Sequence, residues 1–198
     1  TYTDTFHATV DTWTVNSGTL TMSAGQAVGK GIGGGGNVAI TQDNGGARTI
    51  TLNNSGTNDI TMGIGADTVH LGGGSDNGAM DILTVGAGDS VLGGYDSVIL
   101  FSVGTDTLRL GSTTVVDDNA NLNGLTLLDG KITGGVTGGA NINETLANIL
   151  NAVGTEIAAG QIFSWSTGAP TYVFQSDGLA TNIDDTVVQL VGVAAVDF

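Results

Sequence analysis

Short units that begin with glycine, contain aspartate and end in an apolar run repeat along residues 54–111. In chain order the units are SGTNDITM, GIGADTVHL, GGGSDNGAMDILTV, GAGDSVL, GGYDSVIL and GTDTLRL. One unit is too short to bury its own apolar face, so the units are expected to stack side by side as strands and turns. The apolar positions that would line the shared core are Ile60, Val69, Leu83, Val91, Val98 and Leu108.

The composition supports a stack of strands rather than one large globule. Apolar residues make up 40% of the 198, whereas aromatic residues make up only 5%. A core of aliphatic side chains is thin, as in proteins built from stacked repeats. We therefore expect a mainly all-β fold, a parallel β-roll or β-solenoid, with one short helix and a C-terminal β-hairpin module.

Three segments are expected along the chain. Residues 1–53 alternate short strand-like runs with turns, and Gly31 to Gly36 is expected to be a loop. Residues 54–111 form the predicted β-roll, and residues 112–198 form a C-terminal module of strands and one helix.

The C-terminal module is predicted from a change of period. Between residues 142 and 159 the apolar positions follow a helical spacing, with Asn143 as the expected cap and Gly160 as the stop. A hairpin over residues 161–175 and a further strand over residues 186–191 are expected to follow.

The charge balance narrows the possible partners. Nineteen acidic residues face four basic ones, and the formal net charge is -15. Nucleic acid is an unsuitable partner because phosphate binding needs a basic surface. Two carboxylates ~5 Å apart repel each other by about 3 kcal/mol at an effective dielectric constant of ~20, and a bound divalent cation reverses that penalty. The pattern favours a metal, while simple solubility stays open as the other explanation.

Cysteine usage and hydropathy add two exclusions. The chain has no cysteine, which excludes disulfides and thiolate metal sites. Its longest apolar run, residues 187–196, contains Gln189 and is too short to cross a bilayer, so no membrane insertion is expected. The sequence starts at Thr1 with neither an initiator methionine nor a signal peptide. We therefore expect that the chain is trimmed, or that it is exported by a route that recognises its C-terminal end.

One unit matches a known repeat. GIGADTVHL at residues 63–71 resembles the repeats-in-toxin nonapeptide G-G-x-G-x-D-x-U-x, in which U is a large apolar residue. Glycines there allow tight turns, and aspartates reach a Ca²⁺ ion, which takes six to eight oxygen ligands. The resemblance implies Ca²⁺ as the cofactor. The implied ligands and turn glycines are Asp59, Gly63, Gly65, Asp67, Gly72, Gly74, Asp76, Asp81, Gly86, Gly88, Asp89, Asp96 and Asp106.

Two units make one coil of such a roll, so alternate turns are expected on the same edge. One edge then carries Asp67, Asp89 and Asp106, and the other carries Asp59, Asp81 and Asp96. The resemblance implies Ca²⁺ between neighbouring turns of one edge, with Asp76 as a substitute for Asp81. The alternative is that the bends are ordinary β-turns rich in Asp and Gly.

The C-terminal part carries a second resemblance. AAGQIFSWSTGAPTYVFQSDG and DDTVVQLVGVAAVDF are similar to the end of type I secreted bacterial proteins, above all calcium-binding surface-layer proteins. The matching residues are Thr171 to Gln175 and Asp185 to Val193. The resemblance implies a secreted protein at the bacterial cell surface, exported through an uncleaved C-terminal signal.

Enzyme motifs are incomplete. Gly88-Asp89-Ser90 resembles a block of certain esterases, but those need a downstream histidine, and His7 and His70 both lie upstream. Lys30 is followed by Gly31 instead of the Ser or Thr of a phosphate-binding loop. We therefore expect no enzyme activity.

The expected function is structural. We predict a calcium-binding protein that assembles with copies of itself into a surface layer or filament, with a cell-surface polysaccharide as a further partner. One alternative is an adhesin or an ice- or carbohydrate-binding module, which would use the outward threonines of Thr19-Leu20-Thr21 and Thr49-Ile50-Thr51. The other is the calcium-binding C-terminal part of a secreted enzyme.

Overall fold

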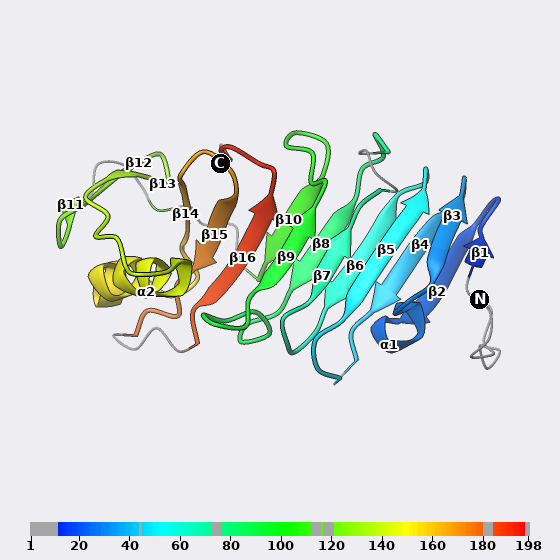
Figure 1. Ribbon diagram of the computed structural model, residues 1–198, viewed down its shortest axis with the longest axis horizontal. Helices are drawn as coiled ribbons and strands as arrows, with labels where there is room; N and C mark the ends of the chain where they lie inside the picture. Colours follow the sequence, from blue (N-terminus) through cyan, green and yellow to red (C-terminus); the bar gives the residue numbers. More distant parts are fainter. Residues whose placement is uncertain are drawn as a thin grey trace.

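The computed structural model describes residues 12–43, 45–72, 77–111, 116, 121–179 and 184–196. These residues are mainly β: they form one 11-stranded mixed sheet and one five-stranded sheet in which all strands are parallel. Figure 1 shows the strands side by side along the long axis of the molecule, with the helix of the C-terminal part at the opposite end from the N-terminus. The expectation of a mainly β fold with parallel strands is confirmed.

Successive strands of residues 12–110, here called the coiled region, alternate between the two sheets. Each strand pairs in parallel with the strand two places earlier, so two strands and two bends make one coil. The strands in the 11-stranded sheet are β1 (Thr12–Thr14), β3 (Gly31–Gly34), β5 (Thr49–Asn54), β7 (Thr68–His70) and β9 (Asp96–Ile99). Those in the five-stranded sheet are β2 (Thr19–Ser23), β4 (Asn37–Thr41), β6 (Asn58–Met62), β8 (Ile82–Val85) and β10 (Thr107–Leu110).

Alternation along each strand builds the core between the sheets. In-register pairing places like positions in a line, as with Ile40, Ile60 and Leu83 across three neighbouring strands. All three are buried. Burying one such side chain contributes roughly 2 kcal/mol, and the neighbouring positions face solvent because successive side chains point to opposite sides.

Most predicted core positions are buried, and one is not in a strand. Ile60, Val69, Leu83 and Val98 belong to the first core cluster, and Leu108 packs against it half-buried. Val91 instead forms isolated bridges outside the named strands. Residues 86–95 therefore form a bend between β8 and β9. The prediction of a core strand at Val91 is wrong, so the sequence predicts one strand too many in this region.

The parallel ladders also include the segment before residue 54. β5 runs across the expected boundary between residues 53 and 54, and it pairs with β3 on one side and β7 on the other. The expectation of a loop over residues 31–36 is wrong for Gly31–Gly34, which form β3 with Ile32 buried. Gly34 is needed because it has φ +106° and a Cβ there would collide with the backbone of Val15.

A short helix, α1 (Ala24–Ala27), follows β2 and was not expected. Ser23 and Gln26 form a capping box around its first turn. That Ser-x-x-Gln pattern is visible in the sequence and is the signal that could have located the helix.

The C-terminal module contains β11 (Asn121–Leu122), β12 (Leu125–Leu128), β13 (Lys131–Gly134), α2 (Ile142–Val153), the 3₁₀ turn η1 (Gly154–Glu156), β14 (Ile162–Ser166), β15 (Thr171–Gln175) and β16 (Thr186–Val191). The predicted hairpin is confirmed as β14 and β15, which are antiparallel. β16 pairs antiparallel with β15 and parallel with β9, so the module extends the 11-stranded sheet.

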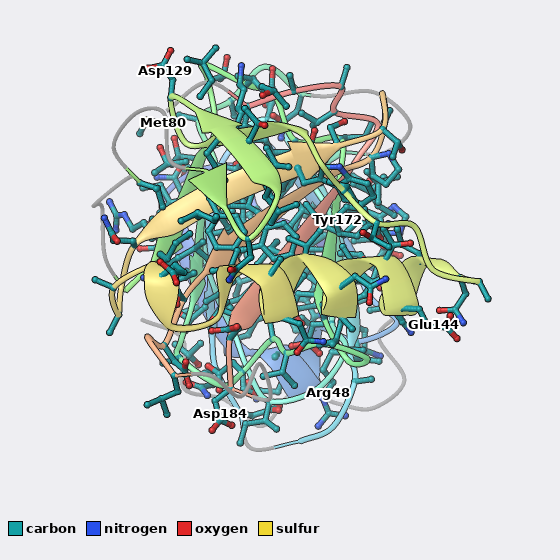
Figure 2. All side chains as sticks on the ribbon, turned by 90° about the vertical axis from the view of Figure 1, so that its left-hand side faces the viewer. Arg48, Met80, Asp129, Glu144, Tyr172 and Asp184 are labelled. Atoms are coloured by element: carbon teal, nitrogen blue, oxygen red, sulfur yellow. The ribbon has the colours of Figure 1, made fainter. Side chains whose placement is uncertain are left out.

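The predicted helix is confirmed with different ends. Asn141, rather than Asn143, is the cap, and its side chain accepts a hydrogen bond from the Glu144 backbone N–H. The helix stops at Val153 because Gly154 takes φ +46°, which is earlier than the expected stop. Figure 2 shows α2 lying across the C-terminal end of the molecule.

A second core lies between α2 and the C-terminal strands. Phe163 and Phe174 stack there with ring centroids 4.8 Å apart, and Trp165 packs on Tyr172 at 6.0 Å. The alternate residues of β14 and β15, such as Val173, face the first core. The buried aromatic residues of the described chain therefore lie in the module, while the buried core of the coiled region is aliphatic, as expected from the composition.

Candidate metal site

The bends of the coiled region lie on two edges. The first edge holds the bends from the five-stranded to the 11-stranded sheet, which include residues 45–48, 63–67 and 86–95. The second edge holds the bends that lead back, which include residues 55–57, 77–81 and 100–106. A bend on either edge lies next to the equivalent bend of the neighbouring coil because the coils pair in parallel.

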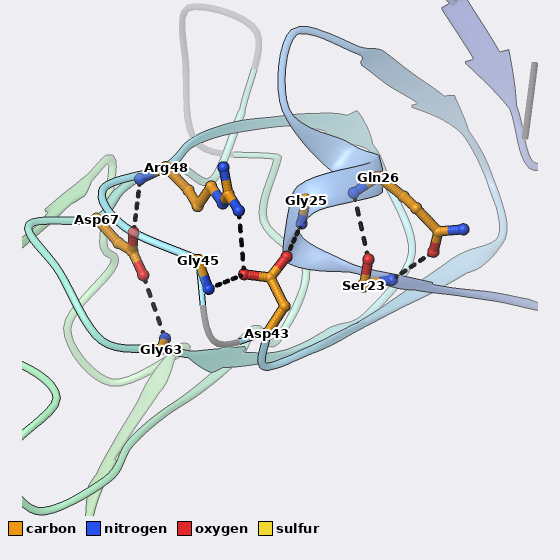
Figure 3. A network of polar contacts seen from close by, with 8 residues as sticks. All are labelled: Ser23, Gly25, Gln26, Asp43, Gly45, Arg48, Gly63 and Asp67. Carbon is orange, nitrogen blue, oxygen red and sulfur yellow. Dashed lines mark hydrogen bonds and ion pairs between the residues drawn. The ribbon is translucent and has the colours of Figure 1, made fainter. Parts of the chain in front are cut away.

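On the first edge, aspartates link one coil to the next. Asp67 Oδ1 accepts the backbone N–H of Arg48 at 2.7 Å, and Asp67 Oδ2 accepts the N–H of Gly63 at 3.2 Å (Figure 3). The backbone N–H of Asp67 then donates to Asp96 Oδ1 at 2.8 Å. Each carboxylate thus receives the N–H that stands just before a strand of the adjacent coil.

The second edge repeats this arrangement. Asp81 Oδ1 accepts the backbone N–H of Asn58 at 3.0 Å, and the N–H of Asp81 donates to Asp106 Oδ1 at 3.0 Å. Asp106 Oδ2 accepts the N–H of Ser102 at 2.8 Å within its own bend. A hydrogen bond to a charged group contributes about 1.5–3 kcal/mol, so these side chains stabilise the stacking of coils.

The structure exchanges two of the predicted residues between edges. Asp96 lies on the first edge and Asp106 on the second, the reverse of the expected arrangement. The pairs Asp89 with Asp106 and Asp81 with Asp96 are therefore separated, and Asp67 with Asp96 and Asp81 with Asp106 are the neighbours. The cause is the extra strand expected around Val91, because one strand too many reverses the edge of every later bend.

Two other predicted ligands behave differently. Asp89 lies on the first edge with Asp67, as expected, and its carbonyl accepts the Gly65 N–H at 3.3 Å. Asp59 is exposed on β6, so the structure does not bring it together with the buried Asp81. Gly74 and Asp76 lie outside the described residues.

Two glycines of the predicted set, Gly63 and Gly65, let neighbouring backbones approach. A Cβ on Gly63 would lie 2.7 Å from the Asp43 carbonyl oxygen, and one on Gly65, with φ +122°, would lie 2.7 Å from the Ala47 nitrogen. Such contacts exclude a side chain at these positions. Gly72 is buried at the end of β7, and Gly86 and Gly88 lie in the bend that contains Asp89.

The electrostatics single out Asp96. Its side chain is 0% exposed, and its Oδ2 has no hydrogen-bond partner. Burial, together with the charges of Asp67 and Asp89, raises the pKa of Asp96 to about 8. Burial likewise raises the pKa of Asp67. A buried carboxylate without a counter-ion is costly, so this position gains from either a proton or a cation.

The pKa of Asp43, which lies on the same edge, shifts in the opposite direction. Burial raises the pKa of Asp43, but hydrogen bonds from Gly45 and Gly25 and the nearby Arg48 outweigh it, so the pKa is lowered. The Arg48 guanidinium lies 3.4 Å from the Asp43 carboxylate (Figure 3). The first edge thus contains one carboxylate that is well compensated and one that is not.

These observations test whether the residues fit Ca²⁺, which needs six to eight oxygens. At Asp67 and Asp106 both carboxylate oxygens already accept backbone N–H groups, which leaves them poorly placed as ligands. Across the part of the chain that the structure describes, no three His, Cys, Asp or Glu side chains converge as a metal cluster. Asp96 fits better, because its bare buried oxygen lies in an acidic surrounding.

None of the helices in the described ranges is long and apolar enough to cross a membrane. The two threonine runs lie on different sheets, Thr19–Thr21 on β2 and Thr49–Thr51 on β5, so they do not share one face.

Comparison with known proteins gives no match to any family model and no significant match to a curated protein.

Proposed function

We propose that the protein is an extracellular structural subunit, a β-solenoid of the repeats-in-toxin kind that assembles with copies of itself at a bacterial surface. The coiled region supports this proposal, because stacked repeats form an extended array that needs a cap or a partner at each end, and the C-terminal module covers one of them. The tail that resembles type I secreted surface-layer proteins supports the location. Millimolar Ca²⁺ outside the cell suits a weak extracellular site.

The observation that carries the calcium part is the buried Asp96 carboxylate. Its Oδ2 lacks a donor, and its Oδ1 is bound to the backbone of the next coil through Asp67. Bound Ca²⁺ would supply positive charge at this bend. Neutralising a group that joins two coils couples metal binding to folding, since the site exists only when the coils are stacked.

The test compares the protein with and without calcium. We expect Ca²⁺ to raise Tm and EDTA to lower it, and we expect assemblies seen by electron microscopy to dissolve in EDTA. Asp96→Asn keeps the Oδ1 acceptor and removes the charge, so it should abolish the calcium-dependent part of Tm. Asp59→Asn is the matched control because Asp59 is exposed and makes none of the bend contacts described above. Equal order and assembly in EDTA would refute the calcium part.

A second candidate, an adhesive face, has one observation in its favour. Hydroxyl side chains align across the outer face of the five-stranded sheet, where Ser23 pairs with Thr41 and Thr61 pairs with Thr84. The register between Ile40 and Ile60 joins these two pairs into one row. Ser23 caps α1 and the Thr41 hydroxyl donates to the Met22 carbonyl, so Thr61 and Thr84 would be the main hydrogen-bonding groups of this row for a polysaccharide. Binding to insoluble polysaccharide that Thr61→Lys abolishes, while Asn53→Lys on β5 leaves it intact, would favour this candidate.

A further inference from the structure

The segment that forms the first described coil carries no charged side chain of its own. Residues 12–29 contain no Asp, Glu, Lys, Arg or His, although the whole chain has a formal net charge of -15. These residues form β1, β2 and α1, which lie at one end of the stack (Figure 1). Copies of so acidic a chain repel each other, and a contact formed by an uncharged segment adds no further carboxylates to that repulsion.

Within the described residues, the same end presents a strand edge that no other strand pairs with. Among the described strands, β2 is the last of the five-stranded sheet and pairs with β4 alone. Edge strands are normally protected by charged residues, proline or a bulge. β2 has the sequence TLTMS, which has no charge and no proline, and its pairing with β4 is regular over all five residues.

Apolar side chains reach the end of the core there. Met22 is buried, and Leu20, Trp13 and Val15 pack half-buried against the first core cluster. Stacked repeats need a polar cap or a partner at their ends because the last coil otherwise exposes one side of its core. At the other end of the coiled region the C-terminal module provides that cover.

We propose that two copies of the chain join end to end through β2, which deepens the assembly proposed above and rests on it. A twofold axis at Thr21 pairs the two β2 strands antiparallel. Leu20 of one copy then lies opposite Met22 of the other. This register keeps apolar side chains facing the core and Thr19, Thr21 and Ser23 facing outward, so the five-stranded sheet continues across the junction.

The absence of cysteine allows a direct test by crosslinking. Thr21→Cys introduces a single thiol that meets its own copy at the proposed axis, where opposite Cβ atoms are about 4.5–5.5 Å apart. We expect at least tenfold faster disulfide dimerisation of the full chain than with Asn53→Cys, which places a thiol at another exposed position, on β5, a strand that is paired on both sides. Equal rates for the two variants would overturn the proposal.

A second pair of variants tests the same contact without a crosslink. Thr21→Lys places two ammonium groups opposite each other at the axis, whereas Asn53→Lys adds the same charge elsewhere. Sedimentation should show at least a tenfold loss of dimerisation for Thr21→Lys and no loss for Asn53→Lys. Because either lysine reduces the net negative charge, a loss confined to Thr21→Lys cannot come from overall repulsion.

The remaining outcomes are also informative. If deletion of residues 1–11 makes a monomeric protein dimerise, the chain's own N-terminal segment occupies the β2 edge and the proposal is wrong. If the surface assemblies form equally well with Thr21→Lys, the end-to-end contact is wrong while the structural function stands. If assemblies form under no condition but Thr21→Cys still crosslinks selectively, the proposed function fails and the contact stands.

Discussion

The coiled region and the C-terminal module bury their cores in different ways. In the coiled region, aliphatic rows such as Ile40, Ile60 and Leu83 repeat from coil to coil, and aspartates at the bends link the coils. In the module, a few large rings such as Phe163 and Phe174 pack under α2. Stability in the coiled region is spread over many similar neighbours, while that of the module depends on a few side chains.

An aspartate before a strand also has a different role in each region. Asp81 and Asp67 accept N–H groups from the neighbouring coil. Asp185, just before β16, instead accepts the N–H of Asp177 within its own loop. Aspartates of the coiled region therefore close their own bends and also join neighbouring repeats, because parallel stacking brings a second backbone within reach, whereas Asp185 closes its loop.

The largest expected effect comes from the module core. Phe174→Ala removes a fully buried ring that stacks on Phe163 and should destabilise the module by about 3–5 kcal/mol. Hydrogen exchange should show lost protection in β14 and β15. If the coiled region loses protection equally, the pairing of β9 with β16 joins both parts into one cooperative unit. The two regions would then not differ in how their stability arises.

Next in size is the loss of one link between coils. Asp81→Ala leaves the buried N–H of Asn58 without its acceptor and should cost about 1–3 kcal/mol in the free energy of unfolding. Asp59→Ala, on the exposed face of β6, should stay within about 0.5 kcal/mol. Urea unfolding measures both, and equal values would show that the aspartate links contribute little.

The pH dependence should separate the regions in calcium-free buffer. The folded pKa of Asp96 is raised from 3.8 to about 8, so the folded protein holds a proton that the unfolded chain releases. Stability therefore falls as pH rises between those values, by at most about 1.4 kcal/mol per pH unit for this group. Burial raises the pKa of Asp185 only to about 6, so the loss of stability that this group causes as pH rises ends at a lower pH than the loss caused by Asp96. Asp96→Asn should flatten the change between pH 6 and 8 in the coiled region, as followed by hydrogen exchange.

The smallest effect is expected at the start of α2. Asn141→Ala removes the acceptor of the Glu144 N–H and should cost about 1 kcal/mol, felt in the module alone. Asn143→Ala is the control, because the cap is not at Asn143. A larger loss from Asn143→Ala would show that the helix begins later than the structure has it.

Much of the fold was predictable from local patterns. The period of the glycine-aspartate units predicts short parallel strands, the helical spacing of Leu146, Ile149 and Leu150 predicts α2, and two strand-like runs predict the hairpin of β14 and β15. The candidate site was predictable only in part. Asp67 and Asp89 were placed together correctly, but Asp96 and Asp106 were exchanged because the unit that contains Val91 looks like a strand by composition.

Local sequence patterns predict which segments are apolar, where the chain turns and where acidic residues are concentrated, because those properties belong to single residues and near neighbours. Local patterns do not predict that β16 pairs with β9, about ninety residues earlier, or that Asp96 is buried while Asp59 is exposed; these features appear only in the folded structure. The reason is that the edge of the stack on which a bend lies depends on how many strands precede that bend. A single added or missing strand exchanges the two edges of the stack without changing any local pattern.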